Sequence, residues 1–369
     1  MKVVRFGIIG CGLMGREFAS AAARWKHLTG MLARPEIVAV SDVNFAATEW
    51  FEAEFATADY HELLARPDID AVYVAVPHNL HEQIYIDVIR AGKHLFTEKP
   101  FGIDLPAAER IFSEVSANPH VLVRCSSEFP FFPGAQRVAA MVESQAFGKI
   151  LEVRAAFCHS SDMDPTKPIN WKRQVATCGE YGCMGDLGLH VLHLPLRFGF
   201  TPKNLRAFLS KIVEQRPDGK GGMAPCETWD NATLACESAQ GFPIILETKR
   251  ISPGDTNSWS IAIYGTENSV EFSTKNPKTL RTMPYQIGQP QTWQEESLGY
   301  VSAYPTITGN IFEFGFPDAI LQMWASFVDE VAGNKPKFQC ATPHEAFASH
   351  QVFTAALESH RSSQVVHFS

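Results

Sequence analysis

Residues 10–15 read Gly-Cys-Gly-Leu-Met-Gly and follow the pattern G-x-G-x-x-G. An apolar run at residues 3–10 precedes them and favours a strand, and an Ala-rich stretch at residues 13–25 follows and favours a helix. In this context the three glycines permit a tight turn, close approach of a pyrophosphate, and close packing of helix on strand. The free N–H groups at a helix N-terminus attract phosphate. The sequence therefore predicts a dinucleotide site that contains Gly10, Cys11, Gly12, Leu13, Met14 and Gly15.

An acidic residue, Asp42, closes the next apolar run at residues 36–43. An acid at this place accepts hydrogen bonds from the adenosine ribose, although it usually lies about 20 residues after the glycines. Residues 26–35 look like an insertion that accounts for the longer spacing here. Residues 43–48 contain no Lys or Arg, so a 2′-phosphate would meet a carboxylate and no cation there. We therefore predict NAD in preference to NADP, and a higher kcat/KM with NADP would contradict this.

The order of apolar runs divides the chain into two parts. In the first, strand-like runs at 36–43, 71–76, 94–97 and 121–125 alternate with helical segments at 45–55, 81–91 and 105–117. This alternation predicts a doubly wound parallel sheet, a Rossmann dinucleotide-binding domain over residues 1–125.

The second part, residues 126–369, has a different texture. Runs at 151–157, 233–238, 243–250, 258–265 and 269–273 are separated by turn residues. They predict a predominantly antiparallel sheet covered by helices at 134–146 and 184–197. Residues 275–310 are rich in Pro, Gly, Gln and Thr and are predicted to be irregular, and two helices at 318–333 and 343–361 are predicted to close the chain.

Composition excludes several classes of protein. The chain has 369 residues and a net charge of −8, which fits two domains and argues against nucleic acid as a partner. No run approaches the 18 or more apolar residues of a membrane span, and the N-terminus lacks the features of a signal peptide. The eight cysteines are scattered rather than regularly spaced. We therefore expect reduced thiols and a cytoplasmic protein with no membrane partner.

Three short stretches carry a resemblance to a known family. They are Pro77 and His81 in AVPHNLH (75–81), Glu-Lys-Pro at 98–100, and Asp-Leu-Gly-Leu-His at 186–190. Together with FFPGAQRV (131–138), Trp171-Lys172 and the C-terminal AALESHRSSQVV, they make the whole chain resemble the Gfo/Idh/MocA family, which includes glucose–fructose oxidoreductase and inositol 2-dehydrogenase. The resemblance implies a two-domain NAD(P)-dependent oxidoreductase acting on sugars, cyclitols or their derivatives. It also implies a homodimer or homotetramer formed by pairing the open sheet faces of the second domain.

The resemblance implies roles for particular residues. Lys99 of the E-K-P tripeptide is expected beside the nicotinamide and the substrate hydroxyl, and Asp186 and His190 are expected to face the same hydroxyl. The remaining cofactor contacts that it implies are Pro77, Asn79, His81 and Glu98.

The chemistry of these side chains agrees with such roles. Oxidation of an alcohol needs a base for the hydroxyl proton, and the pKa of histidine lies near neutrality. Asp186 and His190 are four residues apart, so on a helix they share one face. We assign His190 as the base, Asp186 as the residue that orients it, and Lys99 as a second proton-transfer and electrostatic group. Lys99 as the main acid/base is an open alternative.

Other residues are candidates for the substrate pocket. Besides Lys99, Asp186 and His190, they are Phe129, His159, Trp171 and Lys172. Tyr181, which stands where the family usually has glycine, is interpreted as a packing residue, and His193 stands where the family often has Asp. The spacing of Cys178, Cys183, His190 and His193 matches no zinc motif, so we predict no metal.

Three functions are compatible with these features. The first is an NAD-dependent dehydrogenase that oxidises a secondary hydroxyl of a sugar, glycoside or cyclitol. The second is a redox-neutral glycosidase on the same fold that retains its NAD. The third is a catalytically silent NAD-binding regulator, against which the intact Lys99, Asp186 and His190 argue.

Overall fold

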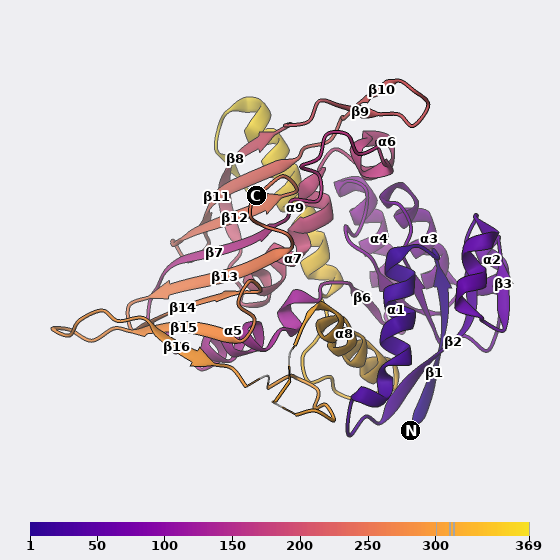
Figure 1. The fold of residues 1–369 in the computed structure, drawn as a ribbon, viewed down its shortest axis with the longest axis horizontal. Helices are drawn as coiled ribbons and strands as arrows, with labels where there is room; N and C mark the ends of the chain where they lie inside the picture. Colours follow the sequence, from indigo (N-terminus) through magenta and orange to yellow (C-terminus); the bar gives the residue numbers. More distant parts are fainter. Residues whose placement is uncertain (300, 310, 313, 369) are drawn as a thin grey trace. The chain divides into compact units, whose positions relative to one another are not determined.

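Strand β1 (Lys2–Ile9) lies inside a six-stranded sheet of the computed structural model, which describes residues 1–299, 301–309, 311–312 and 314–368 (Figure 1). The strand order is β3-β2-β1-β4-β5-β6, and every neighbouring pair is parallel. The other strands are β2 (Ala33–Ser41), β3 (Phe55–Thr57), β4 (Ala71–Val74), β5 (His94–Thr97) and β6 (Val123–Cys125). This is the doubly wound order of a dinucleotide-binding domain, so the predicted fold of this part is confirmed.

Helices and short 3₁₀ turns connect these strands or follow the last of them. They are α1 (Leu13–Ala23), η1 (Trp25–His27), η2 (Phe45–Phe51), α2 (Tyr60–Leu64), η3 (His78–Leu80), α3 (His81–Arg90), α4 (Leu105–Ala117) and η4 (Phe129–Phe131). The α-helix predicted at 45–55 is instead the shorter 3₁₀ segment η2. It ends because Glu52 adopts a left-handed conformation with φ of 49°, and the chain is extended again at β3, where Ala56 pairs with Val40 of β2.

The chain divides into two compact units, and the first contains Met1–Phe131 together with Val301–Phe347. The later segment belongs there because α8 (Phe316–Val331) completes the core of the parallel sheet. Trp324 of α8 stacks on Phe18 with ring centroids 3.6 Å apart and meets Phe6 and Tyr73 edge-on. The observed division therefore differs from the predicted boundary at residue 125.

The second unit, Phe132–Tyr300 and Ala348–Ser369, contains a nine-stranded sheet. Its order is β16-β15-β14-β13-β7-β12-β11-β8-β17, antiparallel except for the parallel pair β12–β7. The strands are β7 (Ile150–Cys158), β8 (Pro202–Ser210), β11 (Asn231–Ser238), β12 (Pro243–Lys249), β13 (Ser258–Gly265), β14 (Asn268–Ser273), β15 (Thr279–Pro284), β16 (Gln294–Ser297) and β17 (Val366–His367). The predicted mainly antiparallel sheet is confirmed.

Two of these strands, β15 and β16, lie inside the segment predicted to be irregular. In β15 the buried side chains of Leu280 and Thr282 alternate with neighbours that are exposed or of intermediate burial, because successive side chains of a strand point to opposite faces of the sheet. The flanking turns, rich in Pro, Gly and Gln, hide this short alternation in the sequence.

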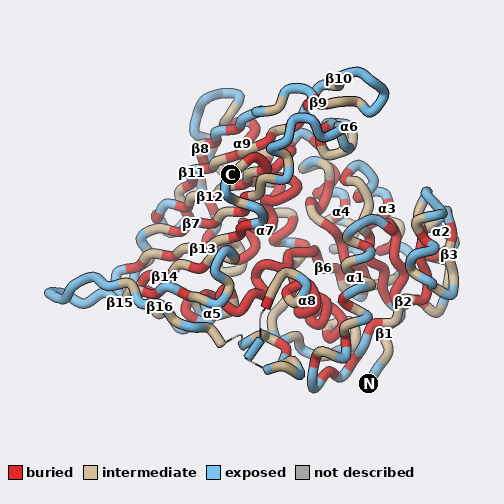
Figure 2. The backbone as a smooth tube through the Cα atoms, viewed as in Figure 1, coloured by how far each residue is buried: buried red, intermediate tan, exposed pale blue. Residues whose placement is uncertain are grey.

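Helices α5 (Pro133–Glu143) and α7 (Cys183–Arg197) pack against the sheet of the second unit. The unit also contains α6 (Val175–Cys178), the part of α9 (Pro343–Ser362) from Ala348 onward, the 3₁₀ turn η5 (Trp171–Arg173) and a small hairpin of β9 (Gln215–Pro217) and β10 (Met223–Pro225). Helix α7 packs against β7, β11 and β12 and is buried through most of its length (Figure 2). A Cβ on Gly188 would lie 2.3 Å from the Phe353 ring of α9, so this glycine permits the two helices to approach closely.

Among the described residues, the structure contains no helix that is both long and apolar enough to span a lipid bilayer.

Candidate cofactor and active-site residues

The glycine loop after β1 has the geometry that its sequence predicts. Gly10 has a φ of +99°, and a Cβ there would lie 2.3 Å from the carbonyl oxygen of Ala75. A Cβ on Gly15 would lie 2.3 Å from the carbonyl oxygen of Gly10. At Gly12, the N-cap of α1, no atom of the described residues comes within 4 Å of such a Cβ. The helix N-terminus is thus open to the backbone approach that a pyrophosphate needs.

Asp42 follows β2 and holds the glycine loop through main-chain hydrogen bonds. The N–H of Cys11 donates to Oδ2 and the N–H of Asn44 donates to Oδ1, each at 2.8 Å. The carboxylate therefore stands at the carboxyl end of β2 beside the loop, where it fits the adenosine ribose. These residues together fit a dinucleotide.

His81 begins α3 and is fully buried. Its Nδ1 lies 2.8 Å from the carbonyl oxygen of Pro100, and its Nε2 lies 3.0 Å from that of Val76. Burial lowers the pKa of His81 to about 4. Through these two contacts the His81 ring links the segment after β4 to the segment after β5. Of the other two predicted cofactor contacts nearby, Pro77 caps η3 and Asn79 is exposed.

Glu98 and Lys99 follow β5 at the same edge of the parallel sheet. Buried Glu98 accepts hydrogen bonds from the Tyr73 hydroxyl at 2.7 Å and from the N–H of Lys99 at 3.3 Å. Its carbonyl oxygen accepts from the Tyr85 hydroxyl at 2.9 Å. The main chain that carries Lys99 is therefore fixed by buried polar groups.

A second buried acid, Glu128, follows the neighbouring strand β6 and was not predicted as a site residue. The N–H of Ser126 donates to the carbonyl oxygen of Thr97, so the segments after β5 and β6 leave the sheet side by side. Burial, reinforced by the charge of Glu98 and opposed by that of Lys99, raises the pKa of Glu128 to about 7. The residue type alone does not reveal that Glu128 is buried or that its pKa is raised in this way.

In the second unit, Asp186 lies in the first turn of α7 and contacts two cations. Lys172 Nζ lies 3.0 and 3.1 Å from its two oxygens, and Arg250 Nη2 lies 2.8 Å from Oδ2. The side chains of Arg250 and Asp186 are 1% and 5% exposed, whereas that of Lys172 is 38% exposed. The carboxylate predicted to orient His190 is therefore held first of all by cations from η5 and the end of β12.

Arg250 is a site residue that sequence reasoning missed. Its Nη1 also donates to the carbonyl oxygen of Lys172 at 3.4 Å, so one guanidinium braces both partners of the ion pair. Two further buried arginines support the surrounding loops. Arg173 pairs with Asp162 and Asp230, and Arg216 donates to main-chain oxygens of residues 162 and 164. No short motif connects these positions, because Arg173 lies 57 residues before Asp230 and Arg250 lies 64 residues after Asp186.

His190 lies on α7 four residues after Asp186, as predicted, and both are buried. The carbonyl oxygen of His190 accepts from Trp259 Nε1 at 2.8 Å, and its ring meets Phe157 edge-on at 5.3 Å. These contacts fix the position of His190 against β13 and β7.

Two predicted pocket residues lie near the Asp186 ion pairs. His159, just after β7, lies 2.8 Å from Ser161 Oγ through Nδ1. Burial lowers its pKa to about 4, with the charge of Asp186 acting in the opposite direction. The Trp171 ring lies 5.6 Å from Lys172 Nζ.

Other candidates have different surroundings. Phe129 lies in the first unit, buried near Phe316 of α8 at 6.1 Å, and its role in substrate binding stays a prediction. The Tyr181 hydroxyl lies 2.6 Å from Thr354 Oγ1 and the ring contacts Phe353, as expected of a packing residue. The described part of the chain contains no group of three or more His, Cys, Asp or Glu residues suited to a metal ion.

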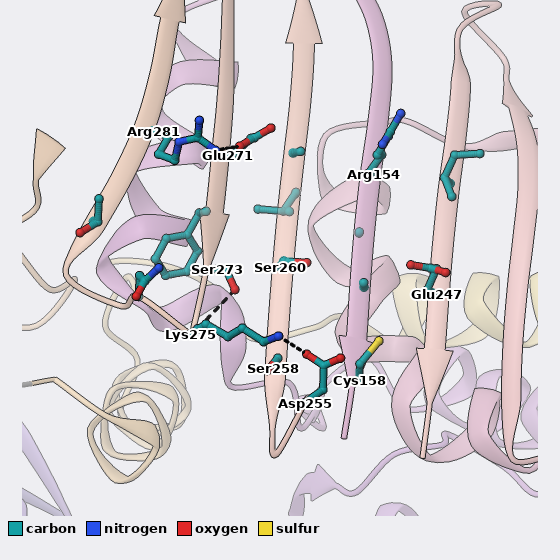
Figure 3. Close-up of a pocket in the computed structure, with 18 of the residues that line it drawn as sticks. Arg154, Cys158, Glu247, Asp255, Ser258, Ser260, Glu271, Ser273, Lys275 and Arg281 are labelled. Carbon is teal, nitrogen blue, oxygen red and sulfur yellow. Dashed lines mark hydrogen bonds and ion pairs between the residues drawn. The ribbon is translucent and has the colours of Figure 1, made fainter. Parts of the chain in front are cut away.

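A pocket of about 720 Å³ lies on the sheet of the second unit (Figure 3). Charged and small side chains from β7 and β12–β15 line it, including Arg154, Ser260, Glu271 and Arg281. Arg281 and Glu271 form a cross-strand ion pair at 2.6 Å. Asp186, Lys172 and Arg250 are not among its lining residues, so it is distinct from the Asp186 site.

Comparison with known proteins agrees with this architecture. Residues 4–124 match the oxidoreductase family with an NAD-binding Rossmann fold, and residues 135–271 match the GFO/IDH/MocA C-terminal domain. The levoglucosan dehydrogenase of Pseudarthrobacter phenanthrenivorans is 25% identical over 299 residues, 76% of each chain. The inositol 2-dehydrogenase/D-chiro-inositol 3-dehydrogenase of Lacticaseibacillus casei is 30% identical over 184 residues, 47% of this chain and 49% of that protein.

Solved structures share the fold over the whole chain. A levoglucosan dehydrogenase in complex with NADH and L-sorbose superposes with a TM-score of 0.89 at 23% identity, covering 100% of this chain and 99% of the other. GenD2 from gentamicin A biosynthesis, in complex with NAD, gives a TM-score of 0.76 at 20% identity, covering 100% of this chain and 97% of the other. With an NAD-binding Rossmann unit followed by the matching C-terminal domain, the chain belongs to the GFO/IDH/MocA family of oxidoreductases.

Proposed function

We propose that this protein is an NAD-dependent dehydrogenase that oxidises a secondary hydroxyl of a sugar, glycoside or cyclitol. The observation that carries the proposal is the buried Asp186, braced by Arg250 and Lys172 on the helix that also bears His190. A chain that keeps this charged arrangement together with Lys99 has the groups that alcohol oxidation needs. The similarity of the chain to a levoglucosan dehydrogenase and to an inositol dehydrogenase supports the proposed class of substrate.

The cofactor is held by residues of the first unit. Gly10, Gly12 and Gly15 shape the pyrophosphate loop, and Asp42 accepts from the ribose hydroxyls. Bound NAD supplies the hydride acceptor of the reaction. Lys99 meets the nicotinamide end, with Glu98 fixing its main chain.

The chain's own residues handle the proton. His190 accepts the substrate hydroxyl proton, and Asp186 stabilises the imidazolium that results. Lys99 donates to the reacting oxygen and polarises it. The reverse division, with Lys99 as the main acid/base, remains an alternative within the same proposal.

The charges around Asp186 support a neutral substrate over a phosphorylated one. Three cationic side chains, Lys172, Arg173 and Arg250, face three carboxylates, Asp162, Asp186 and Asp230. Because each of these three cations already pairs with a carboxylate, a phosphate would have to compete with those carboxylates for them. Lys172, the more exposed of the cations, is the donor we assign to substrate hydroxyls, with Trp171 and His159 as further contacts.

The proposal is tested by measuring NADH formation from NAD with a panel of pyranoses, glycosides and cyclitols. We expect NADH with at least one of them. Lys99→Ala and His190→Ala should each lose most of kcat while still binding NADH in a fluorescence titration. Near-normal turnover in both variants would refute the assignment. Release of an aglycone without added NAD would instead identify the NAD-retaining glycosidase, and activity in neither assay would favour the regulator.

We also propose that the chain forms a homodimer or homotetramer through the sheet face of Figure 3. A sheet covered by helices on one face exposes the other, which is available for a second copy. Light scattering at micromolar concentration tests this, and a monomer would contradict it. All eight cysteines are buried thiols that form no disulfide with one another, which supports the proposal of a reducing, cytoplasmic location.

A further inference from the structure

Three ionisable side chains, Glu98, Lys99 and Glu128, follow the neighbouring strands β5 and β6. These strands are parallel and paired to their ends, and the Ser126 N–H extends the pairing by donating to the Thr97 carbonyl oxygen at 2.9 Å. Lys99 and Glu128 each lie two residues beyond this hydrogen bond. The two chains therefore carry them away from the same edge of the sheet, side by side.

The three side chains belong to one buried cluster. Burial and the charge of Glu98 raise the pKa of Glu128 to about 7, against the opposing charge of Lys99. The Tyr73 hydroxyl donates to Glu98 at 2.7 Å, and burial and the charges of both acids raise the pKa of Tyr73 well above its ordinary value. Two buried carboxylates near one lysine are costly to ionise together. A change of charge nearby therefore decides whether Glu128 holds a proton at neutral pH.

The groups around this cluster change protonation far from neutral pH. Burial holds the pKa of Tyr73 and of Tyr85 well above the ordinary value, raises that of Cys125 to about 12 and lowers that of His81 to about 4. The charged residues of α8, which packs against η4 after Glu128, have partners of their own: Asp318 with Arg24, Asp329 with Asn334, and Glu330 with Arg124. Within the described cluster, a proton gained or lost near pH 7 is therefore assigned to Glu128.

The order of the strands directs the reacting end of the cofactor toward this edge. In a doubly wound sheet a dinucleotide binds across the carboxyl ends of the strands. In the proposed function, on which this inference rests, Asp42 after β2 meets the ribose and the glycine loop after β1 meets the pyrophosphate. The strand order β2-β1-β4-β5-β6 then leads the nicotinamide toward β5, where Lys99 lies.

The nicotinamide ring is positively charged in NAD and neutral in NADH. A positive charge favours an ionised carboxyl group nearby, and its loss favours the protonated form. We propose that Glu128 takes up the proton that alcohol oxidation releases: it is ionised while the nicotinamide is positively charged and protonated once the ring has become neutral.

The proposed step balances and supplies what Lys99 needs as the main acid/base. A protonated lysine accepts no proton until it has given one away, and Glu128 is the acceptor. The substrate C–H bond breaks and its electron pair leaves with the hydrogen to NAD, while the O–H electron pair forms the second C–O bond of the carbonyl group. The hydroxyl proton goes to Lys99 as Lys99 gives a proton to the Glu128 carboxylate. Glu128 returns the proton to water after NADH leaves.

Binding of NAD and of NADH at pH 5.5–8.5 tests this inference without a substrate. In the wild type we expect the ratio Kd(NAD)/Kd(NADH) to fall by about tenfold as the pH rises, because ionised Glu128 attracts only the positively charged ring. In Glu128→Gln the ratio should stay constant, at the value that the wild type has at the acidic end of the range. Calorimetry in two buffers of different ionisation enthalpy should show proton uptake when NADH replaces NAD in the wild type, and none in Glu128→Gln.

Two further variants separate this role from packing and from a general change of charge. Glu114→Gln removes a carboxylate that pairs with Arg90 at the end of α3, before β5 begins and so at the opposite edge of the sheet. This variant should keep the wild-type pH dependence. Lys99→Met removes the cation that favours ionised Glu128, so the fall in the ratio should move to higher pH. A side chain that only fills space would not produce this shift.

The inference is overturned if the wild-type ratio is independent of pH, or if Glu128→Gln keeps the wild-type dependence, since another group would then carry it. Either result in a protein that oxidises one of the tested alcohols would refute the role of Glu128 and leave the dehydrogenase standing. A pH-linked ratio that Glu128→Gln abolishes, in a protein that oxidises none of them, would support Glu128 as the linked proton site and count against the dehydrogenase.

Discussion

The cofactor loop of the first unit and the Asp186 site of the second are built by opposite means. The loop uses main-chain groups and the space left by glycines, with Asp42 as its polar side chain. The Asp186 site is a cluster of charged side chains brought together from η5, α7 and β12. The loop therefore depends on local conformation, whereas the Asp186 site depends on the balance of buried charges.

This difference predicts different responses to mutation. A buried carboxylate is costly unless a cation pairs with it, and removing one partner leaves the other uncompensated. A glycine loop loses its function when a Cβ enters the path of the ligand, even if the fold survives. The following changes test each side of this contrast.

The largest effect is expected for Arg250→Met, which removes the buried cation from Asp186 and keeps its ion pair with the more exposed Lys172. Loss of one partner from a buried pair destabilises a protein by about 3–5 kcal/mol, so the second unit should unfold at lower temperature or denaturant concentration. Where the variant remains folded, kcat should fall by about a hundredfold or more because Asp186 and Lys172 lose their shared brace.

Arg250→Lys tests whether Arg250 positions Asp186 or merely fills space. A lysine keeps the charge and should restore part of kcat and the wild-type shape of its pH profile, whereas methionine should not. Lys172→Met is the matched control, because it removes the more exposed cation from the same carboxylate and should cost less stability. An equal loss of stability in Arg250→Met and Lys172→Met would contradict the contrast between the buried and the exposed partner of Asp186.

Glu128 brings a buried acid into the first unit and gives a pH-dependent test. Its pKa rises from an ordinary 4.5 to about 7 on folding, so the folded chain binds its proton more tightly than the unfolded chain. Its contribution to stability is therefore greatest below pH 4.5, falls by about 3 kcal/mol as the pH rises to 7, and is constant above that. Glu128→Gln should remove this fall and be more stable than the wild type at pH 8.

The measurement is Tm or the urea midpoint between pH 5 and 8 for both proteins. The pKa values of His81 and His159 are lowered to about 4 on folding. Their contribution to the stability of the folded chain therefore changes in the opposite direction, because it decreases as the pH falls from 6.5 to 4. The difference between wild type and Glu128→Gln isolates the contribution of Glu128 from theirs. Parallel curves for the two proteins would show that Glu128 does not change its protonation on folding.

The glycine loop should separate stability from binding. Gly10→Ala introduces a side chain at φ of +99° and 2.3 Å from the carbonyl oxygen of Ala75, and should cost about 1–3 kcal/mol. Gly12→Ala meets no atom of the described chain within 4 Å, so its Tm should stay near that of the wild type. Its affinity for NADH should nevertheless fall about tenfold or more, because the Cβ enters the path of the pyrophosphate. Unchanged NADH binding in Gly12→Ala would show that the cofactor does not approach this glycine.

The same contrast explains what the sequence could predict. The glycine loop, Asp42 and the alternation of strands and helices are local signals, and the structure has them where expected. The i, i+4 relation of Asp186 and His190 is also local, because one helix carries both. Within a single element, periodicity and residue type fix the geometry.

The sequence could not predict which side chains from distant parts of the chain contact one another. The helical pattern of α8 indicates an apolar face, but only the folded chain reveals that Trp324 of α8 stacks on Phe18 in the first unit. In the sequence, nothing distinguishes Arg250 from other charged residues that follow a strand. In the fold it is buried and pairs with Asp186, which lies 64 positions earlier in the chain. In both cases the burial of a side chain depends on a surface supplied by another element.

The smallest effect is expected at the exposed sheet face of the second unit. Arg281 and Glu271 pair across β14 and β15, with side chains 44% and 30% exposed. Exposed pairs contribute less than about 1 kcal/mol to stability, so Arg281→Gln should change Tm slightly, in sharp contrast to Arg250→Met.

If a second copy covers this face, however, the pair loses its contact with water on assembly. The substitution should then shift Tm by an amount that depends on protein concentration. Comparing Tm at two concentrations tenfold apart, together with the mass from light scattering, distinguishes the two cases. A small shift at both concentrations, in a protein that remains oligomeric, would assign the subunit contact to a different surface.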